Sequence, residues 1–252
     1  MSRQADNFVG APMDTGIYDS PSSTTSTIPV GGLALALDAA GNLFVAPMSG
    51  GTLIEYATSG GTQSFPIGRT AESIAVGSDE CTIYYTYESL DGSGRIGRYN
   101  VCLNTAAPDL PIALAFFNTF SGQQRSVRLL PDQSLLVAEQ TSARRIDGSG
   151  TVLSTYAIPG TGSQQWLALA LDPTGTQFWV VVGSSLYRVD VASGSVVGGP
   201  FTVPTTGIPT SMAVAGEWRP GSSAASIPTL EFTFLAGLAV ALAVVAALRM
   251  KF

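Results

Sequence analysis

The sequence predicts an all-β fold: a β-propeller of five four-stranded blades, followed by a C-terminal transmembrane helix. Four internal repeats predict the propeller. Abundant glycine (28) and proline (15) agree with many short strands joined by turns. An uncharged apolar stretch near the C-terminus predicts the helix. We therefore expect three regions: a propeller at 1–215, a linker at 216–231, and a helix with a basic end at 232–252.

The four repeats share one order of elements: an apolar strand, a second apolar strand, an amphipathic strand and a weaker fourth strand. The apolar first strands end at Leu37, Val76, Leu130 and Leu171. A repeat of roughly 40–50 residues with four strands is typical of propeller blades. An eight-stranded barrel or a sandwich is the alternative, but neither predicts this four-strand periodicity.

The expected strands follow in chain order. They lie at 33–37, 43–46, 52–56 and 63–67; at 73–76, 82–86 and 95–99; at 126–130, 134–138, 144–146 and 153–156; and at 167–171, 177–181, 185–189 and 201–203. The first strands of the first and fourth repeats have no polar residue at alternate positions, which is typical of strands that are buried on both faces. Turn-forming residues at 38–41, 131–132 and 172–175 suit the hairpins between strands.

The two ends of the predicted propeller, residues 1–215, are expected to complete one shared blade. Segments 6–10, 16–18 and 26–28 match the second, third and fourth strands of a blade, and 211–215 matches a lone first strand. Propellers commonly seal the ring by building one blade from both termini. Four whole blades and one shared blade make five. A larger ring is the alternative if residues precede Met1 in the natural chain.

The C-terminal stretch from Phe232 to Leu248 has no charged residue. A membrane-spanning helix needs roughly 17–25 apolar residues, so this stretch is just long enough. Arg249 and Lys251 follow as a basic stop. By the positive-inside rule they stay cytoplasmic, and the residues before 227 lie outside the cytoplasm. A buried core helix is the alternative, but such a helix normally has one polar face.

The residues ahead of this helix resemble a known sorting signal. Ile227, Pro228, Thr229 and Leu230, together with Glu231, the helix and the basic end, are similar to the Ile-Pro-Thr-Leu variant of PEP-CTERM tails in Gram-negative bacteria. That family usually has Ser-Glu-Trp after the tetrapeptide, whereas here Glu231 follows directly. The resemblance implies recognition and processing by a membrane transpeptidase, an exosortase. A plain C-terminal anchor is the alternative.

Composition agrees with export to the cell envelope or the extracellular space. The net charge is −6 and no basic cluster exists, which argues against a nucleic-acid partner. The opening residues 1–7 lack the apolar core of a signal peptide. We expect that an N-terminal piece is missing, although a misassigned start codon or a fragment of a longer chain would have the same result.

Residues 37–46 (LDAAGNLFVA), and in part residues 171–175 (LDPTG), resemble NHL-type and lactonase- or streptogramin-lyase-like propeller repeats. This motif is common to many propellers and does not specify an activity. The chain has no histidine, which excludes catalytic triads with histidine and histidine-ligated metals. The lyase-like propellers rely on a histidine, so their activity is not implied. We assign no catalytic residue.

Lactonase-like propellers hold calcium with Glu, Asn and Asp side chains. The candidates here are Asp38, Asn42, Glu55, Asp79, Glu80, Glu139 and Asp172. Most of them fall in turns, where Asp and Asn are common for backbone reasons. Glu55 and Glu139 lie in or beside apolar strands, and solvated edge positions explain them as well. We assign no cofactor or metal ligand, and calcium remains the alternative.

Cys81 and Cys102 are the only cysteines. Cys81 begins a second strand and Cys102 ends the next one, so a hairpin centred near residues 91–92 places them opposite each other. Facing Cβ atoms on neighbouring strands lie about 4.5–5.5 Å apart, close enough for a disulfide after adjustment. A structural disulfide indicates an oxidising compartment. Two free core thiols are the alternative, and zinc would want two further ligands.

The predicted propeller contains two groups of residues that could bind a ligand. Arg125, Arg128, Arg144 and Arg145 could meet an anionic polysaccharide or form a solvated face. The aromatic residues Tyr84, Tyr85, Tyr87, Trp166 and Trp179 could stack on sugars or pack between blades. We expect a non-catalytic binding or structural protein of the envelope or extracellular matrix, with a polysaccharide or protein ligand. The alternative is a calcium-dependent lactonase-like hydrolase.

Overall fold

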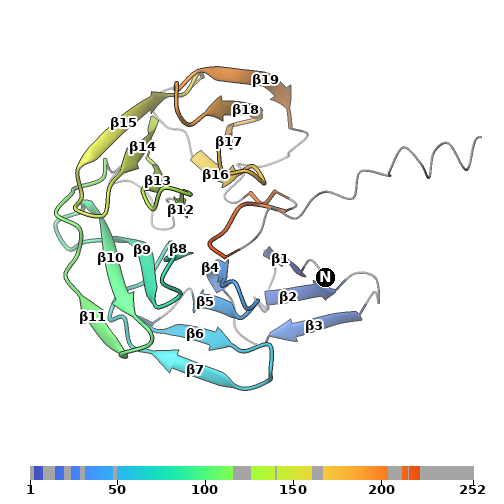
Figure 1. Ribbon diagram of the computed structural model, residues 1–252, viewed down its shortest axis with the longest axis vertical. Coiled ribbons are helices and arrows are strands. Elements are labelled where there is room, and N and C mark those ends of the chain that lie inside the picture. Colours follow the sequence, from blue (N-terminus) through green and yellow to red (C-terminus); the bar gives the residue numbers. More distant parts are fainter. Residues whose placement is uncertain are drawn as a thin grey trace, which may run out of the picture.

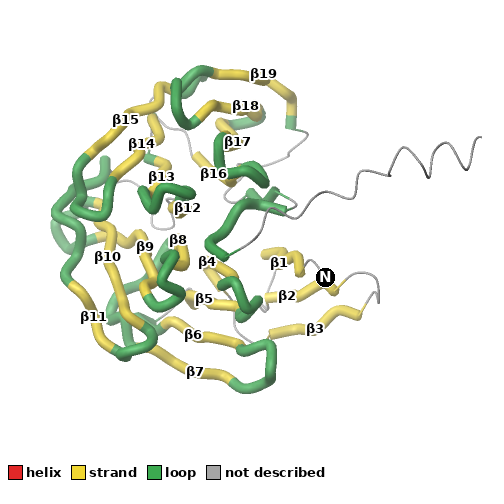
Figure 2. The backbone as a smooth tube through the Cα atoms, viewed as in Figure 1, coloured by secondary structure: helices red, strands yellow, loops and turns green. Residues whose placement is uncertain are grey.

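The computed structural model has an all-β fold in which sheets stand around a common axis (Figures 1 and 2). It describes residues 3–7, 15–19, 24–28, 32–47, 50–115, 126–139, 141–160, 167–203, 212–214 and 216–221. Four of the sheets are four-stranded and antiparallel, which confirms four predicted blades.

Each blade is a meander of strands that follow one another in sequence. The first blade contains β4 (Gly32–Leu37), β5 (Leu43–Pro47), β6 (Leu53–Tyr56) and β7 (Thr62–Phe65). The second contains β8 (Ser73–Val76), β9 (Thr82–Glu88), β10 (Gly94–Asn100) and β11 (Thr105–Ala107). The third contains β12 (Val127–Leu129), β13 (Leu135–Ala138), β14 (Ser142–Ile146) and β15 (Val152–Ala157). The fourth contains β16 (Leu167–Leu171), β17 (Gln177–Val182), β18 (Ser185–Asp190) and β19 (Val196–Thr202).

The first strand of each blade lies nearest the axis, and the last strand forms the outer rim (Figure 1). The inner strands β4, β8, β12 and β16 contact one another in that order. Serine hydroxyls also connect successive inner strands. Ser73 Oγ accepts a hydrogen bond from the Val127 amide at 3.1 Å, and Ser126 Oγ accepts one from the Leu169 amide at 3.4 Å.

The hydrophobic core lies between neighbouring blades, and the third blade contributes to it from both of its faces. On β13, Leu136 and Ala138 pack in the cluster shared with the fourth blade. The alternate residues Leu135 and Val137 pack in the cluster shared with the second blade. Successive side chains of a strand point to opposite faces, so a strand between two blades is apolar throughout. This explains the unbroken apolar runs in the sequence.

A three-stranded sheet precedes the first blade. It contains β1 (Arg3–Asn7), β2 (Thr15–Asp19) and β3 (Thr24–Ile28) in that order, and β1 contacts β4. Three strands were expected here, with the first at 6–10, so that strand begins earlier than predicted. The expected closing strand is 211–215, and its described residues 212–214 belong to no strand. A five-bladed ring therefore stays a prediction.

The predicted sorting motif, helix and basic stop all lie outside the described residues. No helix in the described part of the chain is long and apolar enough to cross a membrane. The expectations for residues 222–252 therefore stay predictions from the sequence.

Candidate functional site

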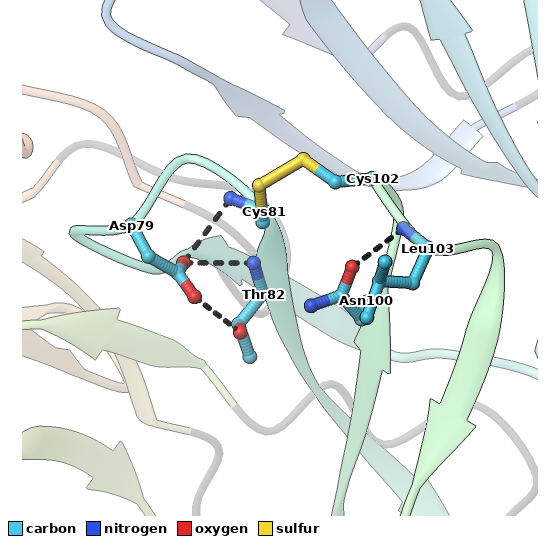
Figure 3. Close-up of a disulfide and its surroundings, with 6 residues drawn as sticks. All are labelled: Asp79, Cys81, Thr82, Asn100, Cys102 and Leu103. Atoms are coloured by element: carbon cyan, nitrogen blue, oxygen red, sulfur yellow. Dashed lines mark hydrogen bonds between the residues drawn. A yellow bond between two sulfur atoms is a disulfide. The ribbon is translucent and has the colours of Figure 1, made fainter.

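A disulfide joins Cys81 and Cys102 in the second blade (Figure 3). Their Cα atoms are 5.2 Å apart. The prediction that these two residues lie directly opposite each other is wrong by one position. The β9–β10 pairing places Thr82 opposite Asn100, so the same register puts Val101, not Cys102, opposite Cys81. The Val101 amide donates to the Cys81 carbonyl, and Cys102 lies one residue further on, in the turn after β10.

Each of the four turns that follow the inner strands contains an aspartate that binds its own turn. We call the turns at 38–42, 77–81, 130–134 and 172–176 the inner turns. The aspartates are Asp38, Asp79, Asp132 and Asp172. Each accepts hydrogen bonds from an amide of its own turn or of the strand that follows. Asp79, for example, accepts from Thr82 N at 2.8 Å and from Cys81 N at 3.1 Å (Figure 3).

The remaining calcium candidates do not converge on one point. Both carboxylate oxygens of Asp38 are engaged by Asn42, and Glu80 accepts from the Ala39 amide at 2.9 Å. Partial burial, with the nearby Asp38 carboxylate, raises the pKa of Glu55. Among the described residues, no group of three or more Asp, Glu, Cys or His side chains could hold a metal ion.

Glu139 is neither a solvated edge residue nor part of a carboxylate cluster. Its side chain is buried in an ion pair with Arg144 and also accepts from the Ala115 amide at 2.8 Å. Arg144 in turn donates to the Ala113 carbonyl at 3.0 Å. This ion pair therefore joins the third blade to the chain that leaves the second blade.

The predicted arginine patch is divided among separate ion pairs. Arg144 pairs with Glu139, Arg145 with Asp132 and Arg128 with Glu217. Each guanidinium has a carboxylate partner, which reduces its attraction for an anionic polymer. Arg125 lies outside the described residues.

The described aromatic candidates also have packing partners. Tyr85 and Tyr87 are buried between the first and second blades, and burial raises the pKa of Tyr85 to about 12. Tyr87 donates its hydroxyl proton to Asp109. Trp179 packs against Phe201 and lies under the Arg188 guanidinium. Trp166 is outside the described part of the chain.

Near the axis, the segment 216–221 supplies a carboxylate that no sequence pattern singles out. Glu217 Oε1 lies 2.8 Å from Arg128 Nε on the inner strand β12. The same oxygen accepts a hydrogen bond from the Leu171 amide, at the end of inner strand β16, at 2.7 Å. Arg128 Nη1 also donates to the Val127 carbonyl at 2.9 Å. The carboxylate of Glu217, which follows the fourth blade in the sequence, thus binds the guanidinium of one inner strand and an amide of another.

The comparison with known proteins identifies the fold only. No protein-family model matches the sequence, and no curated protein sequence matches it. Among solved structures, the chain is similar to a catalytically inactive virginiamycin B lyase from Staphylococcus aureus with quinupristin. The TM-score is 0.53 at 12% identity, over 77% of this chain and 64% of the lyase. The chain therefore spans just under two thirds of that enzyme's length.

Two further solved structures are similar to about the same degree. One is an auxiliary nutrient binding protein from Bacteroides ovatus, with TM-score 0.54 and 14% identity, over 76% of this chain and 53% of that protein. The other is a protein from Bacteroides fragilis proposed to be a 6-phosphogluconolactonase, with TM-score 0.52 and 12% identity, over 77% and 65%. Both catalytic and binding proteins are similar to this chain. The similarity therefore establishes a β-propeller arrangement and no activity.

Proposed function

We propose that this chain is an exported bacterial propeller, sorted or anchored through its C-terminus, that acts as a non-catalytic binding or structural protein of the envelope or extracellular matrix. An exosortase-like enzyme would recognise Ile227, Pro228, Thr229 and Leu230. The apolar stretch 232–248, with Arg249 and Lys251 after it, would hold the chain in the membrane before processing.

The Cys81–Cys102 disulfide supports the export part of this proposal. Disulfides persist in oxidising compartments such as the periplasm and the cell surface, and they are rare in the reducing cytosol. The positive-inside rule, applied to the tail, would put the propeller on that same side of the membrane.

The contacts of two glutamates support the non-catalytic part of this proposal. Glu139 and Glu217 are each held by an arginine and a backbone amide. A calcium site needs several oxygens that converge on one point, and these two carboxylates are held at separate places. The inner-turn aspartates bind their own turns instead.

Replacing residues 227–230 by alanines tests the sorting proposal. The gene, with its upstream codons, would be expressed in a Gram-negative host that has an exosortase. We expect the parent protein to leave the inner membrane and the alanine variant to remain there at full length. A control with alanines at Ser222 and Ser223 should behave like the parent. Equal distribution of all three proteins would contradict sorting through this motif.

The rival hydrolase is tested on the purified propeller. Hydrolysis of a panel of lactones would be followed with calcium and with a calcium chelator. We expect no turnover above the buffer rate in either condition. Calcium-dependent turnover that falls in Glu139→Gln would replace the binding proposal with the lactonase-like one.

A further inference from the structure

The segment 216–221 folds back against the propeller. Figure 1 shows the orange-red chain that contains it over the middle of the ring. The Glu217 amide donates to the Val214 carbonyl at 2.9 Å, which turns the chain inward. The Trp218 amide then donates to the Asp172 carbonyl at 3.2 Å. Trp218 is partly buried against the core cluster of the third and fourth blades.

This segment lies against the inner turns of the first, second and fourth blades. Trp218 lies beside Gly175 of the fourth blade, and Gly175 itself lies against Pro131 of the third. At the far end, a Cβ built on Gly221 would be 2.5 Å from the Cβ of Ala39 in the first blade and 3.9 Å from Glu80 Oε1 in the second. Pro220, between these two ends, is buried.

One charged contact holds the middle of the segment. Glu217 Oε1 receives both the Arg128 guanidinium and the Leu171 amide. About three quarters of each charged side chain is covered, with 23% of Arg128 and 21% of Glu217 exposed. A partly covered, charge-assisted contact with two donors is stronger than an exposed ion pair.

We propose that residues 216–221 form a clasp, an intramolecular ligand that binds the inner-turn end of the axis and closes it. Arg128 and the Leu171 amide are its carboxylate-binding site, and Glu217 is the bound group. External ligands would then reach the axis only from the opposite end. The clasp goes beyond the proposed function and does not depend on how the tail is processed.

Hydrogen exchange of the full chain, followed by mass spectrometry, tests the clasp through Glu217→Gln. Neutralising the carboxylate weakens its contact with Arg128, so the amides of Glu217 and Trp218 should exchange about tenfold faster. The matched control is Asp91→Asn, which neutralises the exposed Arg95–Asp91 pair in the second blade. It should leave the exchange of residues 216–221 unchanged.

An unchanged exchange rate in Glu217→Gln would overturn the proposal. If that variant loses protection throughout the blades, Arg128→Lys gives the same test, because it keeps the positive charge and removes the Nε donor. Faster exchange confined to residues 212–221 in either variant supports the clasp. Exchange as slow as in the parent in Arg128→Lys overturns it.

Chemical labelling tests whether the clasp closes this end of the axis. Phenylglyoxal would be used to modify arginines in the parent and in Glu217→Gln. We expect labelling of Arg128 to rise about tenfold once the clasp loosens, with labelling of Arg95 unchanged as the internal control. Faster exchange of the segment without greater labelling of Arg128 would contradict closure. Neither readout involves the sorting motif, so failure here is distinct from failure of the proposed function.

Discussion

At the scale of single residues, aspartates recur in this chain because they stabilise turns. Asp79 accepts hydrogen bonds from the Cys81 amide, the Thr82 amide and the Thr82 hydroxyl. Partial burial would raise the pKa of Asp79, but these hydrogen bonds outweigh burial and hold the pKa below its ordinary value of 3.8. Short side chains that bind the next backbone amides favour turns wherever they occur.

The lowered pKa predicts how Asp79→Asn depends on pH. A group whose pKa is lower in the folded state stabilises the fold above its unfolded-state pKa, and this stabilisation disappears as the pH falls through the folded-state pKa. Because most of the Asp79 side chain remains exposed, solvent screening limits the loss at pH 6 to about 0.5–1 kcal/mol of unfolding free energy. Urea unfolding should show this loss at pH 6 and a difference that shrinks below pH 3.8. An equal loss at all pH values would contradict it.

Glu217 shows what residue patterns could not predict. Nothing about a glutamate between Gly216 and Trp218 distinguishes it from a solvated linker residue. Its role depends on Arg128, which is 89 positions away in the chain. In contrast, the turn roles of Asp38 and Asp172 were predictable, because their partners are at most five residues away.

At the scale of elements, the β9–β10 hairpin joins two of the structural features described above. The disulfide connects the start of β9 to the turn after β10. Further along the same hairpin, Tyr85 lies opposite Gly97. A Cβ built on Gly97 would be 2.2 Å from Tyr85 Cζ, so the ring lies across the glycine. The tyrosine thereby covers a position that has no side chain of its own.

Gly97→Ala should destabilise the propeller by about 1–3 kcal/mol, because the added methyl group would displace the buried Tyr85 ring. Gly148→Ala is the matched control, since a Cβ there would meet no atom within 4 Å. Thermal unfolding of both variants checks this. A Gly97→Ala protein as stable as Gly148→Ala would show that the ring does not need this space.

The double variant Cys81→Ser/Cys102→Ser should lose about 3 kcal/mol of unfolding free energy, because the disulfide closes a loop with a sequence separation of 21. The midpoint of urea unfolding measures the loss. Parent protein that has been reduced should unfold at the same midpoint as the double variant. An unchanged midpoint in the double variant would mean that the disulfide adds nothing to the stability of the hairpin.

At the scale of the whole molecule, the sequence predicted the repeated parts and missed the parts that occur once. Four blades were visible because the second strands β5, β9, β13 and β17 are largely buried, which makes their sequences apolar and periodic. The short strand Thr105–Ala107 gave no such signal, because its residues are mostly exposed. Residues 212–214 were expected in a strand and lie in none. Their neighbour Glu217 finds its partners on the axis, and such long-range contacts leave no local pattern.

The central claim is that the propeller is exported and that its C-terminal tail is cut off after residue 221. The intact mass of the protein outside the cytoplasm, expressed from the gene with its upstream codons, tests this most directly. We predict a chain that ends between residues 222 and 232, which keeps the segment 216–221 and has lost the apolar stretch. A full-length chain that ends at Phe252 in the membrane fraction would contradict processing and leave a plain membrane anchor.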